Sequence, residues 1–124
     1  MALQTLILYM CLATNGVDEP LNCTEINSAW VPFENKTLGA AINFNPTDLT
    51  ILINQKLAHP EIPLEYLLGV ITHELAHLKS YKSGNSDGHG PRFVATCMKM
   101  STVIGLDGRS CAAVYKAKTE PTPQ

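Results

Sequence analysis

Apolar residues recur at helical spacing through the centre of this 124-residue chain. Between Leu64 and Leu78 they lie mostly three or four residues apart, which is the pattern of a helix with one buried face. The stripe consists of Leu64, Leu67, Leu68, Ile71, Leu75 and Leu78. Pro63 suits the first turn of such a helix, and the polar run from Ser83 to Gly88 ends it.

The same spacing predicts two shorter helices, one at the start of the chain and one after Pro91. The first has an apolar stripe of Leu3, Leu6, Ile7 and Met10. It lacks the basic start and the cleavage site of a secretion signal, and it is too short to span a bilayer. We therefore interpret it as an amphipathic helix of the domain. The later helix begins at Pro91 and has apolar positions at Phe93, Val94, Cys97, Met98, Met100 and Val103.

Three short segments between these helices have strand character. The stretch from Cys23 to Val31 holds one strand, and Leu38 to Phe44 alternates with a period of two. Thr50 to Ile53 forms a compact apolar run after a turn. Because the connections are short, we expect a small antiparallel sheet of about three strands. The chain is thus predicted to form one α+β domain over residues 1–118, with a disordered tail over 119–124.

Two histidines and a glutamate on the central helix carry candidate metal chemistry. His73 and His77 are four residues apart, so on a helix both imidazoles project from one face and can reach a single metal ion. Glu74 would lie close enough to a metal-bound water to act as a general base. The alternative is a pair of surface histidines. We interpret His59, on the loop before this helix, as a surface residue.

A catalytic zinc ion usually has three protein ligands, so a third is expected downstream of His77. The only carboxylates there are Asp87, Asp107 and Glu120. Asp107 lies in a glycine-rich turn and Glu120 in the tail, so a later helix offers no good glutamate ligand. Ser80 and Ser83 stand where a longer three-histidine motif needs glycine and histidine. The remaining candidate is His89, just before the helix that begins at Pro91.

These elements, which read HELAH and HGPRF, resemble the SprT-like metallopeptidases. The segments Thr37 to Ala40, Phe44 to Pro46 and Ile51 to Asn54 look like the strand pair before that family's active-site helix. The resemblance implies a zincin-like minimal metallopeptidase domain, with His73, His77 and His89 as zinc ligands and Glu74 as catalytic base. It also implies a peptide edge strand beside the zinc, and proteins attached to DNA as substrates. Many members add a C-terminal zinc ribbon with paired C-x-x-C motifs, which we do not expect here because Cys97 and Cys111 stand alone.

Three further residues are candidates to contact the substrate or stabilise the transition state: Tyr66, Tyr81 and Arg92. A net charge of −2 and a pI near 6.0 indicate no broad cationic surface, so DNA binding has weak support beyond a local cluster of Lys79, Lys82 and Arg92. No pair of the four cysteines has ribbon spacing, and a disulfide framework is mainly found in smaller secreted domains, so we interpret them as reduced thiols.

Two other function classes stay open at this point. One is a non-catalytic, zinc-stabilised module that binds a protein partner. The other is an exported cell-wall or protein hydrolase. We expect a cytoplasmic protein without a membrane segment, and its architecture suits a bacterial or phage-encoded accessory protein. The oligomeric state and the natural substrate do not follow from the sequence.

Overall fold

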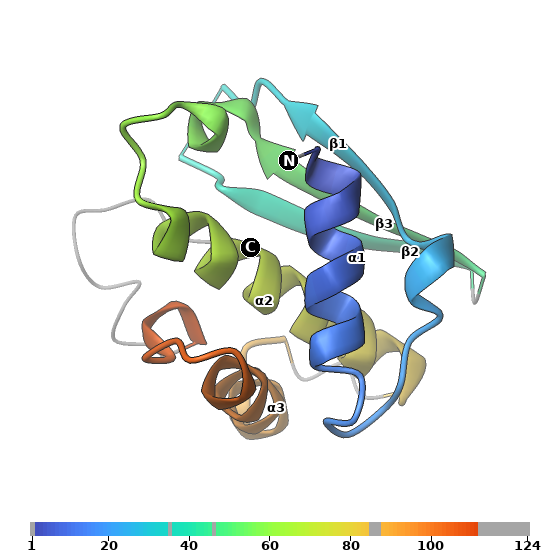
Figure 1. The fold of residues 1–124 in the computed structure, drawn as a ribbon. Helices are drawn as coiled ribbons and strands as arrows, with labels where there is room; N and C mark the ends of the chain where they lie inside the picture. The colour runs from blue at the N-terminus through green and yellow to red at the C-terminus, as the bar shows by residue number, and fades with distance from the viewer. Residues whose placement is uncertain (1, 35, 46, 85–87, 112–124) are drawn as a thin grey trace.

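The computed structural model describes residues 2–34, 36–45, 47–84 and 88–111. Three helices and three strands follow one another in this part of the chain (Figure 1). Their order is α1 (Leu3–Ala13), β1 (Asn27–Val31), β2 (Gly39–Asn45), β3 (Asp48–Asn54), α2 (Leu64–Lys82) and α3 (Pro91–Val103). Short 3-10 helices are η1 (Cys23–Glu25), η2 (Gln55–Ala58) and η3 (Arg109–Cys111). The predicted α+β class is confirmed, while the predicted tail at 119–124 lies outside the described residues.

The helix boundaries follow the sequence signals closely. Pro63 directly precedes α2, and Pro91 occupies the first turn of α3. The chain leaves α2 at Ser83 and turns at Gly84, whose φ of 78° is a left-handed conformation that glycine adopts without steric cost. No helix among the described residues is both long enough and apolar enough to span a bilayer.

The sheet is mixed, so the prediction of an antiparallel sheet was wrong for one of its two strand pairs. Its strand order is β1-β3-β2. β2 and β3 form an antiparallel pair, but β1 pairs with β3 in parallel, with Asn27 opposite Thr50. The prediction assumed that consecutive strands are neighbours. Because β3 lies between β1 and β2, two successive chain reversals leave β1 and β3 running in the same direction.

The sheet, the first two helices and α3 form successive layers (Figure 1). α1 packs against β1, α2 packs against β2 and β3, and α3 packs against α2 on the side away from the sheet. The predicted stripe of α2 is buried at Ile71, Leu75 and Leu78, and that of α1 at Ile7. Leu64, at the start of the α2 stripe, is exposed, so the prediction was wrong there. Both helices are therefore part of the hydrophobic core.

Both cysteine pairs form disulfides, so the expectation of reduced thiols was wrong. Cys11 in α1 is bonded to Cys23 in η1, and Cys97 in α3 to Cys111 in η3. The Cα atoms lie 5.6 Å and 5.7 Å apart, within the range that a disulfide requires. The separations of 12 and 14 residues do not by themselves show that these cysteines are oxidised, and the fold brings the members of each pair together. Each disulfide ties a helix to a nearby 3-10 turn.

The C-terminal end of α2 is fastened to the connection between α1 and β1 by two lysines. The Lys79 ammonium is buried and donates hydrogen bonds to the carbonyl oxygens of Val17 at 2.8 Å and Glu19 at 2.9 Å. Lys82 donates to the carbonyl oxygen of Pro20 at 2.6 Å. Burial lowers the pKa of Lys79, because a low-dielectric environment disfavours its charged form.

Candidate metal centre

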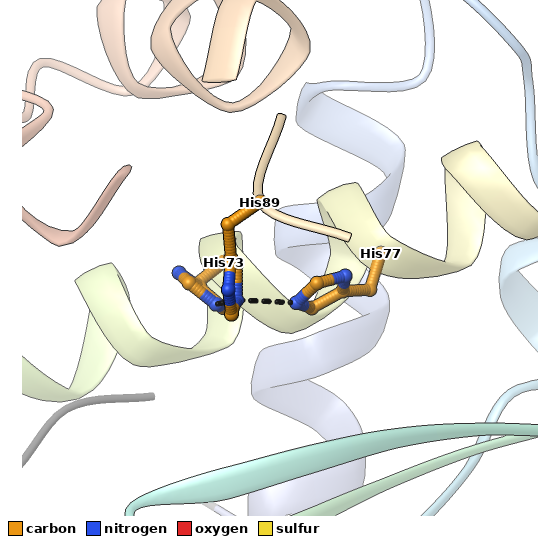
Figure 2. Close-up of side chains that lie close together, drawn as sticks. All are labelled: His73, His77 and His89. Atoms are coloured by element: carbon orange, nitrogen blue, oxygen red, sulfur yellow. Dashed lines mark hydrogen bonds between the residues drawn. The ribbon is translucent and has the colours of Figure 1, made fainter. Parts of the chain in front are cut away.

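Three histidine rings converge between α2 and the segment that precedes α3 (Figure 2). His73 and His77 lie one turn apart on α2, and His89 approaches them from the chain before Pro91. The Nε2 atom of His89 is 3.0 Å from Nε2 of His73 and 3.1 Å from Nε2 of His77. The structure therefore brings the three predicted ligands together, although they come from two separate elements.

The spacing of these nitrogen atoms suits a single metal ion. Ligand nitrogens at about 2.0–2.1 Å from a tetrahedral zinc ion lie roughly 3.3 Å apart. The observed separations of 3.0 and 3.1 Å are close to that value. Neutral imidazole is a favoured ligand of zinc and of other transition metals. The cluster can thus hold a metal ion through three nitrogens, and a tetrahedral ion would keep one position for water or substrate.

His73 is oriented by a backbone carbonyl group. Its Nδ1 atom lies 2.8 Å from the carbonyl oxygen of Ser110 in η3. A carbonyl oxygen only accepts hydrogen bonds, so Nδ1 must carry the proton. The other ring nitrogen, Nε2, then presents its lone pair towards His89. This is the tautomer that a metal ligand needs.

Phe93 packs against all three histidine rings from the first turn of α3. Its ring centroid lies 4.3 Å from that of His77, 4.8 Å from that of His73 and 5.2 Å from that of His89. The side chain is fully buried. Phe93 therefore restricts the ring positions from the side of α3.

Glu74 is fully buried and its carboxylate faces β2. A Cβ atom built on Gly39 would lie 3.0 Å from Glu74 Oε2 and 3.2 Å from its Cγ atom. Gly39 and Ala41 share one face of β2, since residues two apart in a strand point the same way. The first part of this face is therefore made of small residues, and the carboxylate lies at the start of an edge strand.

Tyr81 is the additional candidate that the structure places beside the histidines. Its ring stacks on that of His77 at a centroid distance of 6.0 Å, and its hydroxyl group is 3.5 Å from the carbonyl oxygen of Ala41. Burial raises the pKa of the Tyr81 hydroxyl, and the negative charge of Glu74 raises it further. Tyr81 thus lies between the histidine cluster and β2.

The other two candidates line separate hollows. Tyr66 borders one of about 400 Å³ between the first half of α2 and the segment from Gly105 to Ser110. Arg92 borders another of about 510 Å³, together with Asp18 and Lys79. His59 lies on the surface, as predicted, and its Nδ1 atom accepts a hydrogen bond from the backbone of Glu61.

Sequence reasoning missed three contributors to this site. Phe93 was recognised as part of HGPRF, but its contact with every ring follows only from the fold. Gly39 lies in a segment that was predicted to be a strand, but the sequence did not indicate that this residue lies close to Glu74. Ser110 contributes a backbone carbonyl, which every residue carries, so no residue type in the sequence could have indicated it.

Two histidines of α2 and a third from the turn before α3, with a buried glutamate next to the first in the sequence, define a candidate metal site. The SprT-like family model matches residues 16–116, and the chain belongs to the SprT-like family. This confirms the resemblance carried by HELAH and HGPRF. No curated protein and no solved structure matched the chain.

Proposed function

We propose that this protein is a zinc-dependent endopeptidase with a minimal zincin-like domain. The observation that carries the proposal is the convergence of the His73, His77 and His89 Nε2 atoms at helix α2, which also carries the buried carboxylate of Glu74. In this proposal the three imidazoles hold the zinc ion. Zinc in such a site polarises the scissile carbonyl and lowers the pKa of the attacking water.

Glu74 is the proposed general base and acid. Its carboxylate takes a proton from the attacking water and then delivers it to the nitrogen of the leaving amine. A carboxylate has this role when it lies beside the ligands without being one of them. The sequence places Glu74 next to His73, and the fold directs its side chain towards β2 rather than towards Phe93 and α3.

The edge strand β2 is the proposed binding site for an extended peptide. Among the described strands β2 pairs only with β3, so its outer backbone groups can pair with a substrate strand. Such a substrate would run past Gly39, directly beside the Glu74 carboxylate. Tyr81 lies between β2 and the histidines and is proposed to contact the substrate there. Backbone pairing would give this enzyme broad sequence tolerance.

Substitution of Glu74 by glutamine tests the proposed chemistry. The Glu74→Gln variant should retain one zinc ion per chain and lose roughly 100-fold or more of casein cleavage, because a positioned base contributes about 10²–10⁴-fold. Zinc is measured by elemental analysis and cleavage with an unfolded protein substrate. Glu25→Gln, which changes an exposed glutamate in η1, is the matched control. Cleavage by Glu74→Gln at the wild-type rate would exclude Glu74 as the base.

Proteins bound to DNA are the proposed substrate class, on the strength of family membership. The charge of the chain offers little support, since it is −2 overall. Moreover, Lys79 already donates to two backbone carbonyl groups, so it is not available to a phosphate group. Casein cleavage measured with and without single-stranded DNA tests the idea. Stimulation by DNA would support it, and equal rates would favour a protease that acts without DNA.

The two disulfides favour a second candidate, an exported hydrolase. Structural disulfides persist in oxidising compartments and are rare in the cytoplasm. Under this proposal the protein acts outside the cytoplasm with the same metal centre. Intact mass of the mature protein from its natural source, before and after thiol alkylation, tests it. Four alkylated cysteines in the unreduced protein would favour the cytoplasmic expectation.

A non-catalytic zinc module remains the third candidate. A purely structural zinc site does not require a carboxylate at position 74, and it is usually filled by four protein ligands. The zinc and cleavage measurements on wild type and Glu74→Gln separate an endopeptidase from such a module. A wild-type protein that binds zinc and cleaves none of several unfolded substrates would support the module.

A further inference from the structure

We infer that the Cys97–Cys111 disulfide positions the metal centre, through the peptide group that joins Ser110 to Cys111. This inference rests on the proposed zinc site. The carbonyl oxygen that accepts a hydrogen bond from His73 Nδ1 belongs to the same planar peptide group as the backbone nitrogen of Cys111. Whatever fixes Cys111 therefore fixes the acceptor of His73.

The η3 turn is attached to α3 at several points, and the disulfide is the covalent one. Cys111 is bonded to Cys97 of α3, and its Sγ atom lies 3.5 Å from the hydroxyl group of Ser101. The Cys111 backbone nitrogen donates to the carbonyl oxygen of Gly108 at 3.0 Å. The nitrogen side of the peptide group is thus held by α3 and by the turn, while its oxygen side points to α2.

The turn itself is built so that it returns closely along α3. Gly105 and Gly108 have φ values of 79° and 77°, a conformation that favours glycine. A Cβ atom on Gly108 would lie only 2.5 Å from the sulfur of Met98. The Leu106 backbone nitrogen also donates to the carbonyl oxygen of Ser101 at 2.8 Å. These contacts hold η3 against α3, and η3 also packs against α2, which carries His73 and His77.

Loss of the disulfide should therefore weaken metal binding specifically. A ligand histidine whose other nitrogen has a fixed acceptor keeps one tautomer and one ring orientation. Disturbing such an outer partner typically lowers metal affinity on the order of 10–100-fold. Ser110 thus acts through His73 as a positioning residue, and its contribution comes from its backbone.

The chain contains a matched control for this idea. The Cys11–Cys23 disulfide closes a loop of similar length, with a sequence separation of 12 against 14 for Cys97–Cys111. It joins α1 to η1, whereas the histidines lie on α2 and before α3. In the loop-entropy account of disulfides, the two cross-links restrict the unfolded chain to a similar degree. Their removal should therefore lower the melting temperature by similar amounts.

The experiment compares zinc affinity in two double variants, Cys97→Ala/Cys111→Ala and Cys11→Ala/Cys23→Ala. Alanine is used instead of chemical reduction, because released thiolates would themselves bind zinc. Affinity is measured by competition with a chromophoric chelator, and ligand geometry by the visible absorption of the Co²⁺ form. We expect affinity to fall at least tenfold in the first variant, with an altered Co²⁺ spectrum, and to stay within twofold of wild type in the second.

A second perturbation leaves both disulfides intact. A Cβ atom on Gly69 of α2 would lie 3.3 Å from Ser110 Oγ and 3.4 Å from Ser110 Cβ. Gly69→Ala should thus press η3 away from α2 and lower zinc affinity, although alanine favours the helix. Adding Ser110→Gly removes both crowded atoms and keeps the carbonyl group, so the double variant should recover affinity. This pair tests the link from Ser110 to His73, on which the role of the disulfide depends, even if Cys97→Ala/Cys111→Ala fails to fold.

The outcomes separate this inference from the proposed function. Absence of zinc binding by the wild-type protein would overturn the zinc site itself. If the wild type binds zinc, equal affinity in Cys97→Ala/Cys111→Ala, or equal losses in both double variants, would overturn the positioning role alone. Wild-type affinity in Gly69→Ala would also count against it.

Discussion

The carboxylate of Glu74 lies in the space that a side chain at Gly39 on the edge strand would occupy. A Cβ atom there would lie 3.0 Å from Oε2 and also 3.2 Å from the carbonyl oxygen of Leu52. The absence of a side chain thus sets how closely β2 approaches α2. It also places the start of a peptide-binding edge directly at the proposed base.

Gly39→Ala is expected to separate metal binding from cleavage. The added methyl group must displace the carboxylate or the strand, and displacement of a reacting group by about 1 Å can cost on the order of 100-fold in rate. We expect one zinc ion per chain and a fall in kcat of roughly 10–100-fold. Gly16→Ala is the control, because a Cβ atom there meets nothing within 4 Å. Wild-type kcat in Gly39→Ala would show that this contact does not position Glu74.

His89→Ala should remove most of the zinc. Loss of a direct ligand should cost more than the roughly 10–100-fold in affinity that is typical of an outer partner. Zinc content after dialysis against a chelator is the measurement. His59→Ala, which changes an exposed histidine outside the cluster, should retain wild-type zinc content. Full zinc content in His89→Ala would remove His89 from the site.

Phe93→Leu should lower zinc affinity while causing only a moderate loss in the free energy of unfolding. Leucine fills part of the buried volume, so we expect a loss of about 1–2 kcal/mol, less than the roughly 3–5 kcal/mol for alanine. However, leucine has no ring to pack against the three imidazoles. Zinc affinity and the urea midpoint are measured on the same samples. Phe33→Leu, at a half-buried position, is the control. Unchanged zinc affinity would mean that Phe93 contributes only to the core.

The ionisation of Tyr81 should report the charge of Glu74. Burial, as the larger cause, and the Glu74 carboxylate raise the pKa of this hydroxyl above its usual value of 10.0. In the metal-free protein, Glu74→Gln should therefore lower the pKa of Tyr81 but leave it above the usual value. The ultraviolet absorbance of phenolate, with Tyr81→Phe subtracted, gives the titration. An unchanged pKa in Glu74→Gln would show that the two groups do not interact.

The same shift has a consequence for alkaline stability. Because the pKa of Tyr81 is higher in the folded than in the unfolded protein, the folded state binds more protons between the two values. The stabilisation is fully present below pH 10 and is lost as the pH rises through the folded pKa. Tyr81→Phe should therefore show a smaller loss of stability above pH 10 than the wild type.

Features with a local signature could be predicted from the sequence. Pro63 and Pro91 mark the starts of α2 and α3, and helical geometry alone puts His73 and His77 on one face. The choice of His89 as the third ligand required a further step, the exclusion of the downstream carboxylates. Its convergence with the other rings follows from the packing of α3 on α2.

Features that depend on distant contacts could not be predicted in this way. The parallel pairing of β1 with β3 requires β3 to lie between two strands that are consecutive in sequence. Likewise, no spacing rule indicates that Cys97 meets Cys111, since their proximity depends on the return of the chain at Gly105 and Gly108. The prediction of reduced thiols relied on cysteine spacing and on the size of the domain, and neither carries information on such proximity.

The two cross-links also bear on how the chain acquires its covalent structure. Each cysteine is joined to the one nearest to it along the chain, with separations of 12 and 14 residues. Closing a short loop costs less entropy than closing a long one. Random encounters in the unfolded chain therefore favour these two pairs over a bond from Cys11 or Cys23 to Cys97 or Cys111. Oxidation should thus yield the native pairing without reshuffling, and the first pair can close during synthesis, long before the metal ligands have emerged.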